Sequence, residues 1–194
     1  MSRLVEGENM SKIGRKPISF SSAKVQVNGQ SVTVAGAKAK FVHELPDTLV
    51  ATLKDKNLIL SLAKDEKMSK KNRMDWGLHR ALLANKIKGV EAGFEQVMKI
   101  VGLGFKAQLA GKKLTFTLGY THKIDLDLPV EVTVEVDKTG QLLTFKSYDK
   151  FVLGNICDMV RSFREPEPYK GTGVMRADEV IVRKAGKTKV SASA

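Results

Sequence analysis

The sequence contains one series of features twice, and this repetition constrains the fold more than any other property of the chain. The segment NGQSVTV around Gly29 is echoed by AGKKLTF around Gly111, 82 positions later. A second pair follows in the same order, because Glu44–Pro46 matches Asp127–Pro129 at a separation of 83 positions. A nearly constant separation over several features is typical of a repeated structural unit. The sequence therefore predicts two related units in tandem.

Each copy continues with two predicted strands joined by a turn. In the second copy, the valines of Val130–Val136 alternate with polar residues, and Gln141–Thr144 forms the returning strand. The first copy has Leu49–Leu53 and then a return at Asn57–Leu60. The predicted turns are Asp55–Asn57 and Asp137–Gly140, where Gly and Asn tolerate the positive φ of hairpin loops. Alternation with one polar face predicts sheets that are covered on one side only.

A pattern of helical period closes each copy, and in each the apolar stripe is expected to cover its own sheet. The stripe of the first helix consists of Trp76, Leu83, Ile87 and Val90, widened by Leu78 and Leu82. The stripe of the second helix consists of Val152, Ile156, Met159, Val160 and Phe163. The fold class is therefore α+β, with two tandem duplicated domains, each a mainly antiparallel sheet covered on one face by a helix. A further strand is predicted at Glu179–Val182.

Four segments of the chain follow from these boundaries. Residues 1–17 form a basic N-terminal extension, 18–93 the first α+β domain, 94–182 the second, and 183–194 a basic C-terminal tail. Gly89 and Gly93 are expected to close the first helix. Since only Glu91-Ala92 then separate that helix from Phe94, almost no linker remains between the domains.

Charge indicates the kind of partner. The chain has 33 Lys and Arg against 21 Asp and Glu, a net charge of +12. Such an excess repels itself unless a polyanion neutralises it, which favours nucleic acid or an anionic membrane. A membrane is the weaker choice, because no apolar run approaches the roughly 18 residues of a spanning helix and the start lacks the features of a signal peptide. The single cysteine, Cys157, fits a reducing cytoplasm.

Four segments resemble a known family. They are Met10–Ile18 (MSKIGRKPI), Val101–Ala107 (VGLGFKA), Leu118–His122 (LGYTH) and Arg164–Val174 (REPEPYKGTGV). The last resembles the C-terminal signature of the L-six family of large-subunit ribosomal proteins, which usually reads Pro-Glu-Pro-Tyr-Lys-Gly-Lys-Gly followed by a branched residue. The resemblance to bacterial members runs from about Met10 to Lys187.

The resemblance implies two tandem α+β domains, no enzymatic activity, and a place in the cytoplasm as part of the ribosome. It implies binding to large-subunit ribosomal RNA near the stalk base, beside the docking region of translational GTPases, and contacts with neighbouring large-subunit ribosomal proteins. It also implies that the N-terminal basic segment and the C-terminal segment of the second domain contact RNA. Two positions depart from the family pattern: Thr172 replaces a common Lys and Met175 a common Arg, so two phosphate contacts are in doubt.

The candidate RNA-binding residues combine cations on predicted loops and helix ends with an aromatic side chain and two glycines. They are Lys12, Arg15, Lys16, Lys70, Lys71, Arg73, Lys106, Arg161, Arg164, Tyr169, Lys170, Gly171, Gly173, Lys184 and Lys187.

Each group also has a structural interpretation. The N-terminal cations could belong to an ordinary solvated terminus, or to a flexible arm that follows an RNA groove. Lys70, Lys71 and Arg73 stand at a helix start, where positive charge opposes the helix dipole, so an anionic partner explains them better. Arg161 and Arg164 end a helix, where they complement the dipole as well. Gly171 and Gly173 could let backbone amides approach a phosphate.

An enzyme is the main competing class. Residues 102–107 fit the relaxed dinucleotide pattern Gly-x-Gly-x-x-Ala, but that pattern needs a helix directly after it, and the sequence from Gln108 predicts a strand and hairpin. The three histidines lack the spacing of metal ligands. Cys157 is expected on the helix face away from the stripe, partly exposed, without a His partner. No catalytic residue, metal ligand, cofactor or small-molecule substrate is therefore assigned. A non-ribosomal RNA-binding protein or RNA chaperone remains the alternative.

Overall fold

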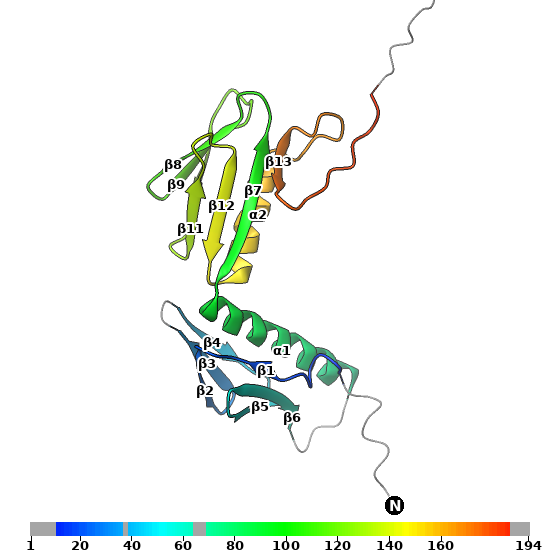
Figure 1. Cartoon of the computed structure of the whole chain (residues 1–194). Helices are drawn as coiled ribbons and strands as arrows, with labels where there is room; N and C mark the ends of the chain where they lie inside the picture. The colour runs from blue at the N-terminus through cyan, green and yellow to red at the C-terminus, as the bar shows by residue number, and fades with distance from the viewer. Residues whose placement is uncertain (1–10, 37–38, 64–68, 187–194) are drawn as a thin grey trace, which may run out of the picture. The chain divides into compact units, whose positions relative to one another are not determined.

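The computed structural model describes residues 11–36, 39–63 and 69–186 and forms two compact units (Figure 1). The first, unit 1, ends at Gly93 and also takes in Tyr148–Lys150. The second, unit 2, comprises Phe94–Ser147 and the chain from Phe151 onward. Each unit combines antiparallel strands with one long helix, so the predicted α+β class is confirmed.

Unit 1 has two three-stranded antiparallel sheets, with orders β2-β3-β4 and β1-β6-β5. Its elements are β1 (Ile18–Ser19), β2 (Lys24–Asn28), β3 (Ser31–Ala35), β4 (Lys40–Glu44), β5 (Leu49–Lys54), β6 (Asn57–Leu62) and α1 (Lys70–Glu91). The turn Asp55-Lys56 joins β5 to β6, and Asp55 has the positive φ of 50° that such a turn requires. The carboxylate of Glu91, at the end of α1, accepts hydrogen bonds from the backbone amides of Ser21 and Ser22, which fixes the chain before β2.

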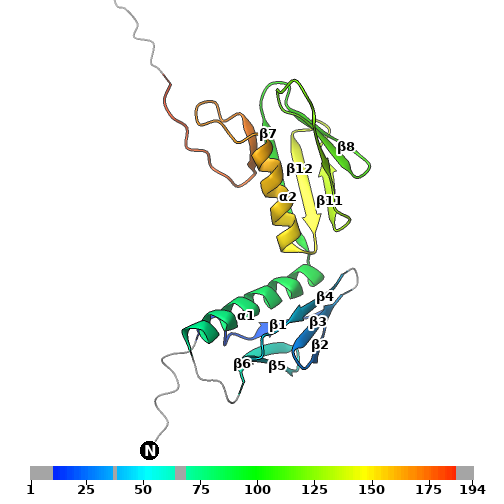
Figure 2. The same ribbon diagram turned by 180° about the vertical axis from the view of Figure 1, so that it is seen from behind.

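Unit 2 repeats this plan with an extended second sheet, because its two sheets have the orders β10-β9-β8 and β11-β12-β7-β13. Its elements are β7 (Phe94–Val101), β8 (Lys106–Ala110), β9 (Lys113–Thr117), β10 (Ile124–Asp127), β11 (Val132–Val136), β12 (Leu142–Ser147), α2 (Lys150–Phe163) and β13 (Gly173–Arg176). Figure 2 shows α2 against one face of the sheet that contains β7, β11 and β12. β13, which the sequence did not predict, extends this sheet beyond β7.

Each unit has its own hydrogen bonds at positions that match those of the other, which is consistent with tandem duplication. The amide of Leu45 donates to the Gln30 carbonyl over 2.8 Å, and that of Leu128 donates to the Lys112 carbonyl over 2.9 Å. The next pair matches too, since Leu49 N to Pro46 O is 3.0 Å and Val132 N to Pro129 O is 3.1 Å. The hairpin glycines Gly29 and Gly111 have φ values of 59° and 62°.

Each unit has its own apolar core. In unit 1, the α1 residues Trp76, Leu83, Ile87 and Val90 are all buried, as predicted. Leu78 and Leu82 were assigned wrongly to that stripe, because they lie on the solvent side and are 53% and 39% exposed.

In unit 2, the buried side of α2 is rotated relative to the prediction. Leu153, Ile156, Cys157 and Val160 are buried, whereas Met159 is exposed. The expectation of a partly exposed Cys157 is therefore wrong. Burial raises the pKa of its thiol to about 11, so the nucleophilic thiolate is scarce at neutral pH.

A chain of three polar groups ties β4 to α1. His43 Nε2 lies 3.0 Å from His79 Nδ1, and Lys86 Nζ lies 3.3 Å from His43 Nδ1. Because an ammonium group can only donate, His43 Nδ1 is the acceptor and Nε2 carries the proton that is donated to His79. This arrangement requires the His43 imidazole to be neutral. Burial first, then the charge of Lys86, lowers the pKa of His43 to about 4.

Acidification should therefore destabilise unit 1. Between the unfolded pKa of about 6.5 and the folded value, the unfolded chain binds the His43 proton and the folded chain does not, so stability falls as pH falls. Urea unfolding followed by the fluorescence of Trp76 should show a loss of about 2 kcal/mol from pH 7 to pH 5. In His43→Phe this pH dependence should flatten. An equal slope in wild type and variant would contradict the assignment.

Candidate nucleic-acid interface

The N-terminal cations lie on an ordered turn. Gly14 approaches the ring of Trp76 so closely that a Cβ there would lie 2.7 Å from it. Arg80 Nε donates to the Lys16 carbonyl over 3.1 Å and Nη2 donates to the Pro17 carbonyl over 3.3 Å. Of the two interpretations of this segment, the flexible arm does not fit residues 11–17, which contact α1. Lys12, Arg15 and Lys16 nevertheless keep exposed side chains.

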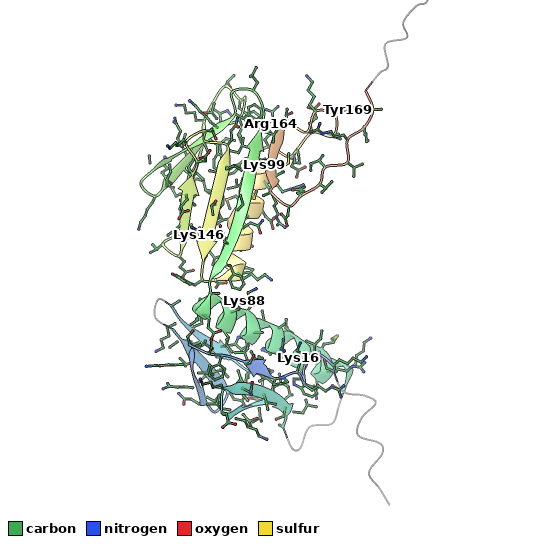
Figure 3. The ribbon with its side chains drawn as sticks, viewed as in Figure 1. Lys16, Lys88, Lys99, Lys146, Arg164 and Tyr169 are labelled. Atoms are coloured by element: carbon green, nitrogen blue, oxygen red, sulfur yellow. The ribbon has the colours of Figure 1, made fainter. Side chains whose placement is uncertain are left out.

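The cations at the start of α1 lie where the sequence predicts. Ser69 is the N-cap and its Oγ accepts from the Asn72 amide over 3.1 Å. Lys70, Lys71 and Arg73 are exposed, and the first turn carries no acidic residue. These charges oppose the helix dipole without any stabilising carboxylate in that turn. Figure 3 labels Lys16 beside α1, and the turn that carries the N-terminal cations contacts Trp76 and Arg80 of the helix that Lys70, Lys71 and Arg73 begin.

The segment after α2 folds into a loop held by its own backbone. The Gly171 amide donates to the Glu167 carbonyl and the Glu167 amide to the Thr172 carbonyl, both over 2.9 Å. Gly171 and Gly173 are buried, and a Cβ on Gly173 would lie 2.7 Å from the Glu165 carbonyl oxygen. The expectation that these glycines open backbone amides to a phosphate is therefore corrected: they close the loop instead.

The two departures from the family signature also have places in this loop and its strand. Thr172 Oγ1 donates to Glu167 Oε2 over 3.2 Å, so it stabilises the loop. Met175 lies in β13 opposite Lys99 and is half-buried. Thr172 and Met175 therefore do not supply the positive charges of the Lys and the Arg that are common at these two positions of the family.

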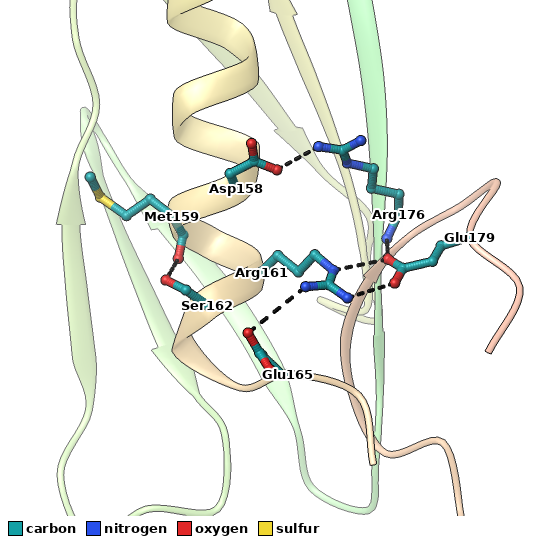
Figure 4. A network of polar contacts seen from close by, with 7 residues as sticks. All are labelled: Asp158, Met159, Arg161, Ser162, Glu165, Arg176 and Glu179. Atoms are coloured by element: carbon teal, nitrogen blue, oxygen red, sulfur yellow. Dashed lines mark hydrogen bonds and ion pairs between the residues drawn. The ribbon is translucent and has the colours of Figure 1, made fainter. Parts of the chain in front are cut away.

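Arg161 holds the C-terminal segment to α2 (Figure 4). Its Nη2 and Nε donate to the two carboxylate oxygens of Glu179 over 2.7 and 3.1 Å, and Nη1 lies 3.9 Å from Glu165. These hydrogen bonds, led by those from Arg161, lower the pKa of Glu179. Glu179 Oε2 also accepts from the Arg176 amide. The strand predicted at Glu179–Val182 does not form.

Breaking this pair should loosen the C-terminal segment without unfolding unit 2. In Glu179→Gln, the amide keeps the size of the side chain but loses the charged bidentate pair. We expect faster hydrogen exchange of the Lys184 amide, measured by mass spectrometry, and a fall in melting temperature of less than about 3 °C, because the pair is partly exposed. Glu135→Gln, which removes an exposed ion pair with Lys146, is the control and should leave the Lys184 amide unchanged.

The C-terminal segment that Glu179 fixes to α2 returns to the loop after α2. Four exposed side chains lie on the two segments there. The Lys184 amide donates to the Pro168 carbonyl over 2.9 Å, and the Arg183 guanidinium lies beside Gly171. We call Tyr169, Lys170, Arg183 and Lys184 the C-terminal basic surface; all four are exposed. Of the predicted residues, the structure thus brings together Tyr169, Lys170 and Lys184. Lys106 is exposed at the start of β8, and Lys187 lies outside the described residues.

Arg164, a predicted RNA-binding residue, has contacts within unit 2. Its Nη1 donates to the Leu118 carbonyl over 3.0 Å, and its guanidinium lies over the rings of Phe105 and Tyr120. Phe105, Tyr120 and His122 were not among the predicted site residues, although two aromatic rings directly after Gly119 in a short loop were a signal.

The dinucleotide-like pattern and the histidines have other places in the fold. Gly102-x-Gly104 is followed by strand β8, as predicted, so the helix that a dinucleotide site needs does not follow it. Among the described residues, no group of three or more His, Cys, Asp and Glu is placed to hold a metal ion. His43 and His79 come together, but as a hydrogen-bonded pair. Within the same residues, no helix is long and apolar enough to cross a membrane.

These features define a basic protein of two related α+β units whose cations lie on surface loops and helix ends. A family model described as Ribosomal protein L6 matches residues 101–177. The large ribosomal subunit protein uL6 of Methylacidiphilum infernorum is 42% identical over 92% of this chain and 98% of its own length. The uL6 proteins of Carboxydothermus hydrogenoformans and Desulfatibacillum aliphaticivorans are each 40% identical over 92% of this chain, and over 97% and 99% of their own lengths.

The chain belongs to the uL6 family of large ribosomal subunit proteins. It is accordingly a structural constituent of the large subunit in the cytoplasm, takes part in translation as an RNA-binding ribosomal protein, and is not an enzyme.

Proposed function

We propose that the chain binds large-subunit ribosomal RNA through the C-terminal basic surface, near the stalk base and the docking region of translational GTPases. The observation that carries the proposal is the convergence of Tyr169, Lys170, Arg183 and Lys184, all exposed, on a loop that its own hydrogen bonds hold closed. Phosphates attract the three cations and the ring offers a stacking face. The location near the stalk base rests on the family resemblance.

A second contact involves unit 1. Lys12, Arg15, Lys16, Lys70, Lys71 and Arg73 are exposed at one region of that unit, and those on α1 gain from an anion near the helix start. In this proposal both units bind large-subunit ribosomal RNA, and neighbouring large-subunit proteins also contact the chain. Such binding supports subunit assembly. No small-molecule substrate takes part.

Competition in moderate salt tests the proposal. The full chain is bound to labelled large-subunit ribosomal RNA and challenged with unlabelled RNA of random sequence or with the same ribosomal RNA. We expect only the ribosomal RNA to compete well, and the affinity to fall steeply as salt rises, because phosphate contacts release counterions. Equal competition by random RNA would favour a general RNA chaperone and contradict specific binding.

A further inference from the structure

Four planar groups of unit 2, which we call the stack, contact one another in series beside the end of α2. The Arg164 guanidinium carbon lies 5.2 Å from the centre of the Phe105 ring and 5.0 Å from that of Tyr120. The Tyr120 ring lies in turn 5.8 Å from the His122 ring, at an interplanar angle of 20°. These contacts therefore connect Phe105 to Arg164, Arg164 to Tyr120, and Tyr120 to His122.

The stack is held in place from its inner end. Arg164 Nη1 donates to the Leu118 carbonyl over 3.0 Å, and Tyr120 Oη donates to the Phe163 carbonyl over 3.2 Å. Gly119 has a φ of 76°, and a Cβ there would lie 2.8 Å from the Phe105 ring. The loop between β9 and β10 is thus fixed to the end of α2 at both Leu118 and Tyr120. A preorganised stack loses little conformational entropy when it binds a further planar group.

Exposure increases toward the outer end. Phe105 and Arg164 are half-buried, Tyr120 is 45% exposed, and His122 is exposed. The stack therefore ends at an aromatic ring with an accessible face, next to the exposed cation Lys123. A planar ligand with a negative charge nearby fits this combination, since the face stacks and the ammonium group attracts the charge. A nucleotide has both parts.

We infer that His122 and Tyr120 are a stacking platform for one unpaired nucleobase of the ribosomal RNA. The base must be unpaired and unstacked on one side, because bases inside a helix have both faces covered by their neighbours. Arg164 and Phe105 are positioning residues that hold the platform. The inference rests on the proposed RNA binding and adds a contact to the base itself, in contrast to the phosphate contacts of the C-terminal basic surface.

The test compares the affinities of full-length variants for deproteinised large-subunit ribosomal RNA over a range of salt concentrations. His122→Ala removes the outer ring and should weaken binding roughly 10-fold. It should leave the salt dependence unchanged, because no phosphate contact is lost. His122→Phe restores a stacking face and should bind within about 3-fold of wild type. Thr121→Ala, an exposed neighbour in the same loop, is the matched control and should bind like wild type.

Lys170→Ala is the reference for a phosphate contact and should weaken binding while reducing the salt slope by about 1. If Lys170→Ala weakens binding but His122→Ala does not, the platform is refuted and the proposed function stands. If His122→Phe binds as weakly as His122→Ala, a hydrogen bond of the imidazole replaces stacking and the inference is wrong. If neither lysine nor histidine matters, the proposed function fails as well.

Crosslinking supplies a direct readout of the base. Irradiation of wild-type large subunits at short ultraviolet wavelengths joins stacked aromatic side chains and bases, and trypsin then releases the peptide Leu114–Lys123. Mass spectrometry should find this peptide attached to a single nucleotide in wild type and not in His122→Ala. An unmodified peptide in wild-type subunits, alongside crosslinks of other proteins in the same sample, would refute the platform.

Discussion

Replacement of Trp76 by alanine is expected to lower the free energy of unfolding of unit 1 by about 3–5 kcal/mol. The side chain is only 3% exposed and belongs to the core of that unit. Its Nε1 donates to the Leu60 carbonyl over 3.0 Å, so the variant also leaves this buried acceptor without its partner. The turn that contains Gly14 loses the ring against which it lies. Urea unfolding followed by circular dichroism measures the loss.

The matched control lies on the other side of the same helix. Leu78→Ala removes an apolar side chain that is 53% exposed, so its cost should stay below about 1 kcal/mol. Trp76 is the only tryptophan of the chain, and its fluorescence therefore reports the unfolding of unit 1 directly in this control. A loss in Leu78→Ala as large as that in Trp76→Ala would contradict the orientation of α1.

The second large effect is expected on RNA binding. Simultaneous replacement of Tyr169 and Lys170 by alanine removes a 54% exposed ring and an exposed cation from the C-terminal basic surface. We expect affinity for large-subunit ribosomal RNA to fall by about 10- to 100-fold, because a stacked base and a phosphate each lose a partner. The variant should be depleted from purified large subunits, as measured by quantitative mass spectrometry.

Stability separates this effect from misfolding. Neither side chain belongs to the core of unit 2, so the melting temperature of the free variant should change by less than about 2 °C. Lys56→Ala, in the exposed turn between β5 and β6, removes a cation that belongs to neither proposed contact, and it should assemble normally. A large fall in melting temperature in the double variant would mean that Tyr169 and Lys170 are structural.

The sequence predicted the repeated plan because local patterns determine it. The positive-φ glycines Gly29 and Gly111, the Leu-Pro pairs and the helical periods all describe interactions within one copy. The exact buried side of each helix was less predictable. On α2 the apolar residues extend over more than one face, and only packing against the sheet decides that Cys157 is buried while Met159 is exposed.

The C-terminal segment shows why periodicity alone can mislead. The alternating apolar residues of Glu179–Val182 favour a strand. A strand also needs a neighbouring strand to pair with, and residues 179–182 do not pair with any described strand. Glu179 instead binds Arg161, which comes from 18 positions earlier in the chain. No local pattern contains such a contact.

The sequence predicted which residue types form the candidate site better than it predicted the contacts of each residue. Charge and the signature selected Lys170 and Lys184, which lie together because the Lys184 amide reaches the Pro168 carbonyl. The same reasoning gave Arg161 and Arg164 as RNA-binding candidates, but the first is paired with Glu179 and the second lies over two rings. Long-range pairing of this kind depends on the tertiary fold.

The most direct test of RNA binding through the C-terminal basic surface is a lysine-reactivity footprint of the assembled large subunit. Free protein and intact subunits are treated briefly with an amine-acetylating reagent, and modification is quantified by mass spectrometry. Lys170 and Lys184 should react readily in the free protein and be strongly protected in the subunit, whereas Lys56 should react in both. Equal reactivity of Lys170 and Lys184 in the two samples would contradict the proposed surface.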